Sequence, residues 1–232
     1  MMLGDNKDKI GIDELVIPNY LVSINDEISG FTVPKIEGDN LGVIVNNSKI
    51  SNEKKLEYLY KVGKLIKKTQ KLNSEKIKFN FGDLHEYNFI VGEDDKTYAI
   101  DLDGGYLNGG EPQPSKYLTI NKNLNLFPTK YIKDANGLII PDNNSDLLCY
   151  NIMILNTIGR GKISKMNKDD YNEYINYLNQ LGFGKDILKS FKNIYSINDN
   201  LNPCDYFEQI PNDKIGEAGL KVFEYKKKRG KI

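Results

Sequence analysis

The 232-residue sequence predicts an α+β protein in which short strands come first and helices follow. Two observations lead to this prediction. Runs of β-branched and aromatic residues, separated by turn residues, occupy the front of the chain and a second stretch before residue 110. Apolar residues at helical spacing then fill most of the chain from residue 146 onward. With 39% hydrophobic and 28% charged residues, the chain has enough apolar material for a packed core.

The first 70 residues predict a hairpin, a connector and a long helix. Strands over 15–24 and 28–36 flank an Asn-Asp-Glu turn, and the polar, glycine-bearing stretch 37–42 is interpreted as a connector. Apolar residues recur near helical spacing over 51–70, behind a serine and an asparagine that can each cap a helix. Because a two-stranded hairpin is marginally stable alone, we expect its apolar face to be exposed or covered by a partner.

The rest of the chain predicts two more strands, a long irregular loop and a series of helices. Strands over 89–91 and 98–100 surround a five-residue turn. Residues 104–141 show no sustained period, and loops of that length are usually functional. The first helix after the loop is apolar on all sides, which is typical of a central buried helix. The helices are predicted over 146–158, 169–181, 185–195, 203–209 and 213–228.

Composition excludes several classes of protein. The 32 basic and 32 acidic residues cancel, so no long-range positive field attracts nucleic acid. Two cysteines, Cys149 and Cys204, cannot form a disulfide framework, which favours a reducing compartment. The start of the chain lacks the pattern of a signal peptide, and no run reaches the ~18 apolar residues of a membrane span. We therefore expect a cytoplasmic protein without nucleic-acid or membrane partners.

The residues that could carry chemistry lie between positions 79 and 105. Asp83 precedes the only histidine, His85, by two residues, and Asn88 follows Asp83 by five. An aspartate on a turn, an asparagine at the start of a strand and Asp101 at the end of the paired strand would bring three oxygen ligands together. Such ligands suit Mg²⁺ carrying a phosphate. The alternative is that each is an ordinary turn or loop residue, with His85 at the surface.

This pattern resembles the catalytic loop of the protein-kinase-like superfamily, in which H-R-D-L-x-x-x-N is followed by D-F-G. The spacing from Asp83 to Asn88 matches, and Asp101 stands where the metal-binding aspartate of the family lies. The sequence G-D-L-H-x-x-N is closer to the aminoglycoside and small-molecule phosphotransferase branch than to eukaryotic protein kinases. Asp146 matches the family's aspartate that opens the buried central helix and holds the backbone of the catalytic loop.

The resemblance implies a role for each matching residue. Asp83 would accept or orient the proton of the substrate hydroxyl, and Asn88 and Asp101 would hold Mg²⁺. His85 would stand where many kinases place a phosphate-contacting lysine. Asp103 departs from the family's glycine and is either an additional acid near the metal or a solvated turn residue. The implied cofactors are ATP and Mg²⁺.

The resemblance also implies a division of the chain into two lobes. Residues 1–36 would be a reduced small lobe built on the hairpin, and residues 37–232 would be the helical large lobe. The large lobe would contain the catalytic loop 79–105 and the activation-segment-like loop 104–141. The hinge that meets adenine in the family would be Pro34, Lys35, Ile36 and Glu37.

Two functions from different classes follow. The first is an Mg/ATP-dependent phosphotransferase acting on a protein Ser/Thr or a small-molecule hydroxyl. The second is a catalytically weak pseudokinase, or truncated kinase-like module, that binds a protein partner or a second copy through the hairpin. The second is favoured by the lack of a G-x-G-x-x-G motif before the hairpin and of an assignable third-strand lysine. The sequence carries no motif that identifies the substrate.

Overall fold

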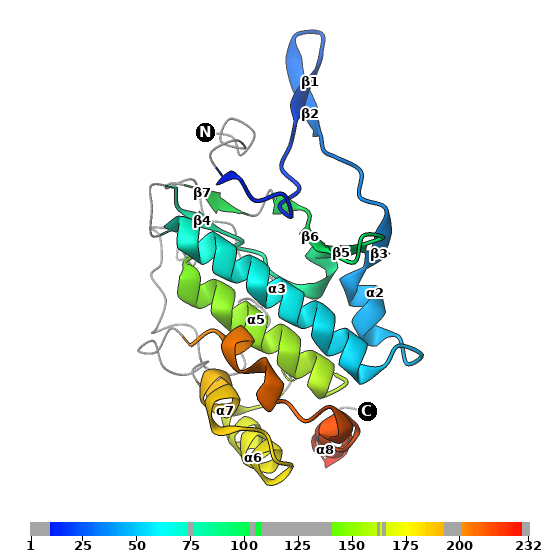
Figure 1. Ribbon diagram of the computed structural model, residues 1–232, viewed down its shortest axis with the longest axis vertical. Helices are drawn as coiled ribbons and strands as arrows, with labels where there is room; N and C mark the ends of the chain where they lie inside the picture. Colours follow the sequence, from blue (N-terminus) through cyan, green and yellow to red (C-terminus); the bar gives the residue numbers. More distant parts are fainter. Residues whose placement is uncertain are drawn as a thin grey trace.

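The computed structural model describes residues 10–73, 77–102, 105–107, 141–161, 163, 166–192 and 201–228. Helices form the body of the molecule, and three small sheets lie along one side of it (Figure 1), so the α+β class is confirmed. The strands are β1 (Tyr20–Ile24), β2 (Glu27–Thr32), β3 (Gly38–Asn40), β4 (Phe79–Asn80), β5 (Phe89–Gly92), β6 (Thr97–Ala99) and β7 (Tyr106–Leu107). The α-helices are α2 (Leu41–Asn46), α3 (Asn52–Asn73), α5 (Asn143–Ile158), α6 (Lys168–Gln180), α7 (Lys185–Lys192) and α8 (Ile215–Lys228), and the 3₁₀ helices are η2 (Glu86–Asn88), η7 (Pro203–Gln209) and η8 (Asn212–Lys214).

Helix α5 is the central element of the core, as its apolar sequence predicts. Twelve of its sixteen residues are buried. It begins at Asn143, three residues earlier than expected, because Asp142 and Ser145 form a reciprocal cap. The Asp142 carboxylate accepts the Ser145 N–H at 2.7 Å, and the Ser145 hydroxyl accepts the Asp142 N–H at 2.9 Å. This cap places Asp146 in the first turn of the helix, with its side chain buried.

Helix α3 lies alongside α5 (Figure 1). It confirms the helix predicted over 51–70 and continues three residues further. Gly63 allows the close approach, because a Cβ atom built there would lie 2.7 Å from the Cβ of Cys204 and would also meet the Tyr150 hydroxyl. That hydroxyl donates to the carbonyl of Leu59 at 2.7 Å, and burial raises the pKa of Tyr150 well above its ordinary value. One buried hydrogen bond and one glycine therefore fix the spacing of the two longest core helices.

The sheets are small and antiparallel. Strands β3, β5 and β6 form one sheet, β4 pairs with β7, and β1 pairs with β2. The predicted pair over 89–91 and 98–100 is confirmed as β5 and β6, shifted by one residue at the ends. The connector predicted over 37–42 instead contains β3 and the start of α2, because Asn40 caps that short helix through the N–H of Gly42.

The N-terminal segment differs from the prediction in both strands. Strand β2 covers Glu27–Thr32 instead of 28–36, so it ends four residues earlier than expected. Strand β1 begins at Tyr20, five residues later than expected. Leu15, Val16 and Ile17 are buried in the helical body instead, where Leu15 forms a parallel bridge with Ala99 and the N–H of Val16 donates to the Ala99 carbonyl at 2.9 Å. Pairing with β6 buries these three apolar side chains, which a longer hairpin strand would leave exposed.

The hairpin β1–β2 projects from the body (Figure 1). Of its eleven strand residues, only Gly30 is not exposed to solvent. Large apolar side chains on both strands are therefore open to water, including Tyr20 at 74%, Ile28 at 66% and Phe31 at 54% exposure. An exposed apolar surface of this kind is unusual in a protein that functions without a partner.

The last part of the described chain is helical, as predicted. The helices predicted over 169–181, 185–195 and 213–228 correspond to α6, α7 and α8, and the one predicted over 203–209 is η7. The hydroxyl of Tyr171 on α6 donates to the carbonyl of Phe191 on α7 at 2.9 Å, inside the core. Among the described residues, no helix is both long and apolar enough to cross a membrane.

Candidate functional site

Asp146 of α5 holds the backbone of the loop that follows β4. One oxygen of this carboxylate accepts the backbone N–H of Phe81 at 3.1 Å and the side-chain amide of Asn80 at 3.2 Å. A further hydrogen bond comes from the backbone of Gly82. Burial raises the pKa of Asp146 to about 7, against the lowering effect of these donors. A single buried carboxyl group therefore fixes the backbone on which the predicted chemistry lies.

Asn80 is a supporting residue that the sequence analysis does not identify. Its buried side-chain amide bonds both Asp146 and, at 3.1 Å, the side-chain oxygen of Asn143. It ties strand β4 to the first turn of α5. The only sequence signal is an asparagine within a short apolar strand, where a polar side chain needs a hydrogen-bonding partner.

The loop turns sharply so that Asp83 faces outward. Gly82 has a φ of +68°, a conformation that favours glycine, and the N–H of Asp83 donates to the carbonyl of Phe81 at 2.7 Å. The Asp83 side chain is 31% exposed, whereas the loop residues on either side of it, Gly82 and Leu84, are buried. The turn thus presents one carboxylate to solvent on a backbone that is otherwise packed into the core.

His85 lies beside Asp83. Its Nε2 atom is 3.5 Å from Asp83 Oδ2, and its Nδ1 atom accepts the N–H of Tyr87 at 3.2 Å. Because Nδ1 is an acceptor here, the ring proton of the neutral imidazole is on Nε2 and faces the carboxylate. The ring is buried and is the N-cap of η2. The structure thus brings His85 and Asp83 together, and the alternative of a surface loop histidine is wrong.

Asn88 closes the loop. Its side-chain NH₂ donates to the carbonyl of Asp83 at 2.9 Å, across five residues. The residue is buried and directly precedes β5. Because the amide nitrogen is used in this bond, the amide oxygen is the atom that can act as a ligand.

Asp101 is placed next to Asn88 by the β5–β6 pair. The N–H of Ile100 donates to the carbonyl of Asn88 at 2.9 Å, so the residue after Ile100 follows directly from this contact. Asp101 is exposed and has a φ of +56°, which only a small fraction of non-glycine residues adopt. Such backbone conformations are concentrated at functional sites.

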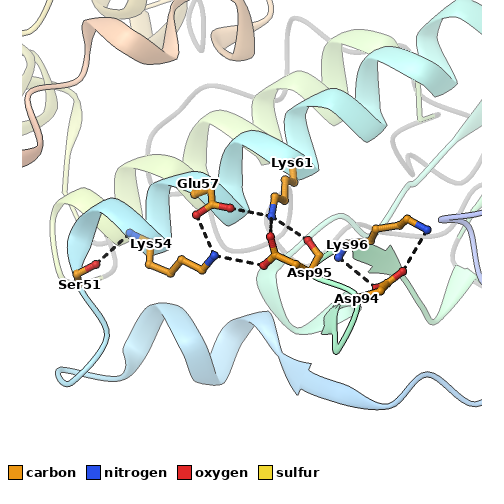
Figure 2. Close-up of polar contacts among 7 residues, drawn as sticks. All are labelled: Ser51, Lys54, Glu57, Lys61, Asp94, Asp95 and Lys96. Carbon is orange, nitrogen blue, oxygen red and sulfur yellow. Dashed lines mark hydrogen bonds and ion pairs between the residues drawn. The ribbon is translucent and has the colours of Figure 1, made fainter.

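The far end of the β5–β6 pair is fastened to α3 by an ionic cluster formed by Lys54, Glu57, Lys61 and Asp95 (Figure 2). Lys61 reaches the turn twice, with Nζ 2.8 Å from the Asp95 carbonyl and a second hydrogen bond to its carboxylate. Hydrogen bonds from Lys61 and Lys54 hold the pKa of Asp95 below its ordinary value. The β5–β6 pair, which places Asn88 and Asp101, is thus held at both ends: at its turn by α3 and at Asn88 by the loop.

The predicted hinge residues Pro34, Lys35, Ile36 and Glu37 connect β2 to β3 without regular secondary structure. Pro34 and Ile36 are half-buried, while the exposed Lys35 and Glu37 form an ion pair of 2.6 Å. The carbonyl of Glu37 accepts the N–H of Glu93 at 3.2 Å, which places the segment at the turn end of β5. Asn88 lies at the other end of that strand, roughly 13 Å away at ~3.3 Å per residue.

Asn88 and Asp101 carry oxygen atoms of the kind that bind magnesium. Asn88 supplies an amide oxygen, and Asp101 supplies an exposed carboxylate from the adjacent strand end. Mg²⁺ is typically held by one or two protein oxygens together with waters and phosphates. Within the described ranges, no group of three or more His, Cys, Asp or Glu side chains is arranged to hold a metal ion. Asp103 lies outside the described residues, as does the loop 104–141 except for residues 105–107 and 141.

A cavity of about 400 Å³ lies on another part of the surface. It is lined by residues 10–14, by Lys68, Lys71 and Leu72 of α3 and by Lys96 of the β5–β6 turn. Two of its lysines are engaged in ion pairs, Lys68 with Glu14 and Lys96 with Asp94. The sequence analysis does not predict this cavity, because its walls come from three separate segments.

No family model matches this chain, and no curated protein matches it. The chemistry of the loop is therefore the basis on which a function can be assigned.

Proposed function

We propose that this chain is an Mg/ATP-dependent phosphotransferase of the protein-kinase-like superfamily, acting on a protein Ser/Thr or a small-molecule hydroxyl. One observation carries the proposal. A single turn presents Asp83, its backbone is held by buried Asp146, and Asn88 both bonds that turn and adjoins Asp101. A general base and two oxygen ligands on one rigid support are among the parts that proteins use for phosphoryl transfer.

The kinase-like fold is part of the same proposal. The hairpin, linker, helix α3, catalytic-type loop, β5–β6 pair and buried helix α5 follow one another in the order expected of a reduced small lobe and a helical large lobe. The link from Asp146 to the backbone of the loop supports this fold most strongly. It joins two motifs 65 residues apart, in the way that the resemblance implies.

Asp83 would act on the acceptor hydroxyl. Its carboxylate accepts the hydroxyl proton or orients the oxygen for attack, as a general base does within hydrogen-bonding distance. The neighbouring His85 borders this carboxylate, with Nε2 3.5 Å from Asp83 Oδ2. Asn88 keeps the carbonyl of Asp83 in place, so the direction of the carboxylate is set by the backbone as well as by the side chain.

Asn88 and Asp101 would hold the metal, and residues 34–37 would meet the adenine base. Magnesium, when bound with ATP, neutralises charge on the phosphates during transfer. The positive φ of Asp101 directs its carboxylate from a strand end that is already fixed by the Ile100–Asn88 hydrogen bond. Positioning of this kind is the main contribution of a protein to phosphoryl transfer.

The test is calorimetric titration of the purified chain with ATP, with and without Mg²⁺, followed by a phosphate-transfer assay on protein and small-molecule hydroxyls. Asp83→Asn is expected to bind Mg-ATP like the original chain but to lose at least ~100-fold in turnover. Asp101→Asn is expected to weaken magnesium-dependent binding. The matched control is Asp94→Asn, an exposed aspartate on the β5–β6 turn, which should change neither. Absence of binding at millimolar ATP, or binding indifferent to Mg²⁺, would contradict the proposal.

A second candidate is a catalytically weak pseudokinase that binds a partner. The observation that favours it is the exposed apolar hairpin, which adds nothing to the chemistry of the loop. In this case Mg-ATP would bind with the same dependence on Asp101, and Asp83→Asn would change no measurable turnover because there is none to lose. The transfer assay therefore separates the two candidates.

A further inference from the structure

Among the described residues, no further strand pairs with the hairpin β1–β2, and its two outer edges differ in character. The register of the β1–β2 pair shifts between Val22, which lies opposite Gly30, and Ser23, which lies opposite Ile28. Strand β2 therefore has one extra residue, Ser29, at this point. A bulge of this kind interrupts an edge and hinders pairing with another strand. Strand β1, Tyr-Leu-Val-Ser-Ile, contains no bulge residue, charge, proline or glycine. The outer edge of β1 is thus a row of backbone groups without any of the usual protection against pairing.

We propose that the outer edge of β1 pairs with β1 of a second copy of this chain, antiparallel about a two-fold axis at Val22. Val22 then lies opposite its own counterpart, and Tyr20 lies opposite Ile24 of the other copy. The pairing turns two hairpins into a four-stranded sheet, which exceeds the three strands that a sheet usually needs to be stable. Symmetric pairing of one patch with itself is the commonest form of homodimer.

The side chains suit this pairing. Aromatic and β-branched residues opposite one another stabilise neighbouring strands, and Tyr20 with Ile24 is such a pair. No charge lies within β1, so the two-fold axis brings no like charges together. Tyr20 is 74% exposed, Val22 40% and Ile24 60%, so all three have area to bury.

The apolar side chains on β1 suit a small interface between two copies. Seven large apolar side chains between Tyr20 and Val33 are 40–74% exposed. Four of them, Tyr20, Leu21, Val22 and Ile24, lie on β1, where pairing along its outer edge can cover them. Stable interfaces bury about 800 Å² per partner, and weak ones bury less. We therefore expect a dimer of moderate affinity, which forms whether or not the chain transfers phosphate.

The experiment measures sedimentation velocity of the full chain from about 1 to about 200 μM, a range that makes a moderate equilibrium visible. The chain is expected to shift from monomer to dimer within this range. Val22→Asp and Val22→Lys each place like charges opposite one another at the axis, and each should weaken the dimer at least ~10-fold. An equimolar mixture of the two variants should dimerise again, because opposite charges then face one another. Val22 is exposed at 40%, so neither change removes a core contact.

Two controls make the result specific. Leu220→Lys alters another exposed apolar residue, on α8, and should leave the dimer unchanged. Circular dichroism of each variant shows whether it is folded. The proposal is overturned by a chain that stays monomeric, by a dimer that the Leu220 variant disrupts, or by a mixture of the Val22 variants that fails to associate although each is folded. The first of these outcomes would leave the β1 edge for a strand from a different protein.

Discussion

Asp146 is the residue on which the candidate site depends most directly. Its carboxyl group is buried, yet it accepts hydrogen bonds from the Phe81 and Gly82 backbone and from the Asn80 side chain. Burial favours the neutral acid, and these donors favour the carboxylate. The nearby Asp142 carboxylate also raises the pKa of Asp146. The balance, a pKa of about 7, lies within the range in which the protein would work.

This balance predicts a pH-dependent stability. Between its ordinary pKa of 3.8 and about 7, Asp146 binds a proton in the folded chain but not in the unfolded one. Its contribution to the free energy of unfolding is thus fully present below about pH 4 and is lost as the pH rises to about 7, with a slope of at most ~1.4 kcal/mol per pH unit. Urea denaturation of the original chain and of Asp146→Asn, at several pH values, measures the difference.

The variant removes this titration while keeping an oxygen that can accept the Phe81 N–H. We therefore expect the difference in free energy between the original chain and the variant to shrink or reverse as pH rises from 4 to 7. A difference independent of pH would mean that the carboxylate is charged throughout and that its three donors outweigh burial. A matched Asp142→Asn variant removes the nearby charge and should lower the pH at which Asp146 loses its proton in the folded chain.

The sequence predicts the reactive groups of the site and its support Asp146, but it does not identify Asn80. The spacing of Asp83, Asn88 and Asp101 indicates that they meet, because a turn and a two-stranded pair are local structures. The two hydrogen bonds from Asn80 to Asn143 and Asp146 span more than sixty residues, and the sequence around Asn80 does not identify these partners. Local patterns thus identify the reactive groups, the resemblance identifies Asp146, and only the contact of β4 with α5 identifies Asn80.

At the scale of elements, helices are predicted well and strand limits poorly. The periodicities of α3 and α5 are properties of a few consecutive turns, so the sequence contains them. Whether Leu15–Ile17 join the hairpin or the body depends instead on pairing with β6, about eighty residues away. The short helix α2 depends on the Asn40 cap. The ionic cluster on the β5–β6 turn is predictable in part. Lys54 and Lys61 are two helical turns apart and share a face of α3, but their partner Asp95 lies in a different segment.

The packing of α3 on α5 gives a sharp prediction for Gly63→Ala. The added methyl group would meet the Tyr150 hydroxyl and would lie 2.7 Å from Cys204 Cβ. Overpacking of this kind costs about 1–3 kcal/mol, which exceeds the gain in helix propensity. Thermal or urea unfolding should show a less stable variant.

The matched control is Gly216→Ala in α8, where an added Cβ atom meets no atom within 4 Å. There the methyl group brings only higher helix propensity, so a gain of about 0.5–1 kcal/mol is expected. Equal effects at the two positions would show that Gly63 is not a point of close helix contact.

On the scale of the whole molecule, stability is unevenly distributed. The body has one core that includes α3, α5, α6 and α7, whereas the hairpin is exposed on both faces. Local opening costs little where few apolar contacts are lost. Amide hydrogen exchange of the Val22→Asp chain, which we expect to be monomeric, should show β1 and β2 at least ~1000-fold less protected than α5.

The same measurement on the original chain provides the comparison. Protection of β1 should rise with protein concentration, while protection of α5 should not change, because the dimer covers only the hairpin. A hairpin as well protected as α5 in the Val22→Asp chain would show that the body itself covers it, contrary to its exposure in the structure.

The link from Phe81 to Asp146 also sets an order of events during synthesis. The two residues are 65 positions apart. At about 5–20 residues per second, the ribosome releases Asp146 about 3–13 s after Phe81. During that interval Phe79 and Phe81, which pack edge to face at 5.3 Å in the finished protein, have no helix α5 to cover them. The nascent chain thus exposes these two side chains for several seconds, and the loop that bears Asp83 gains its support only after Asp146 has been synthesised.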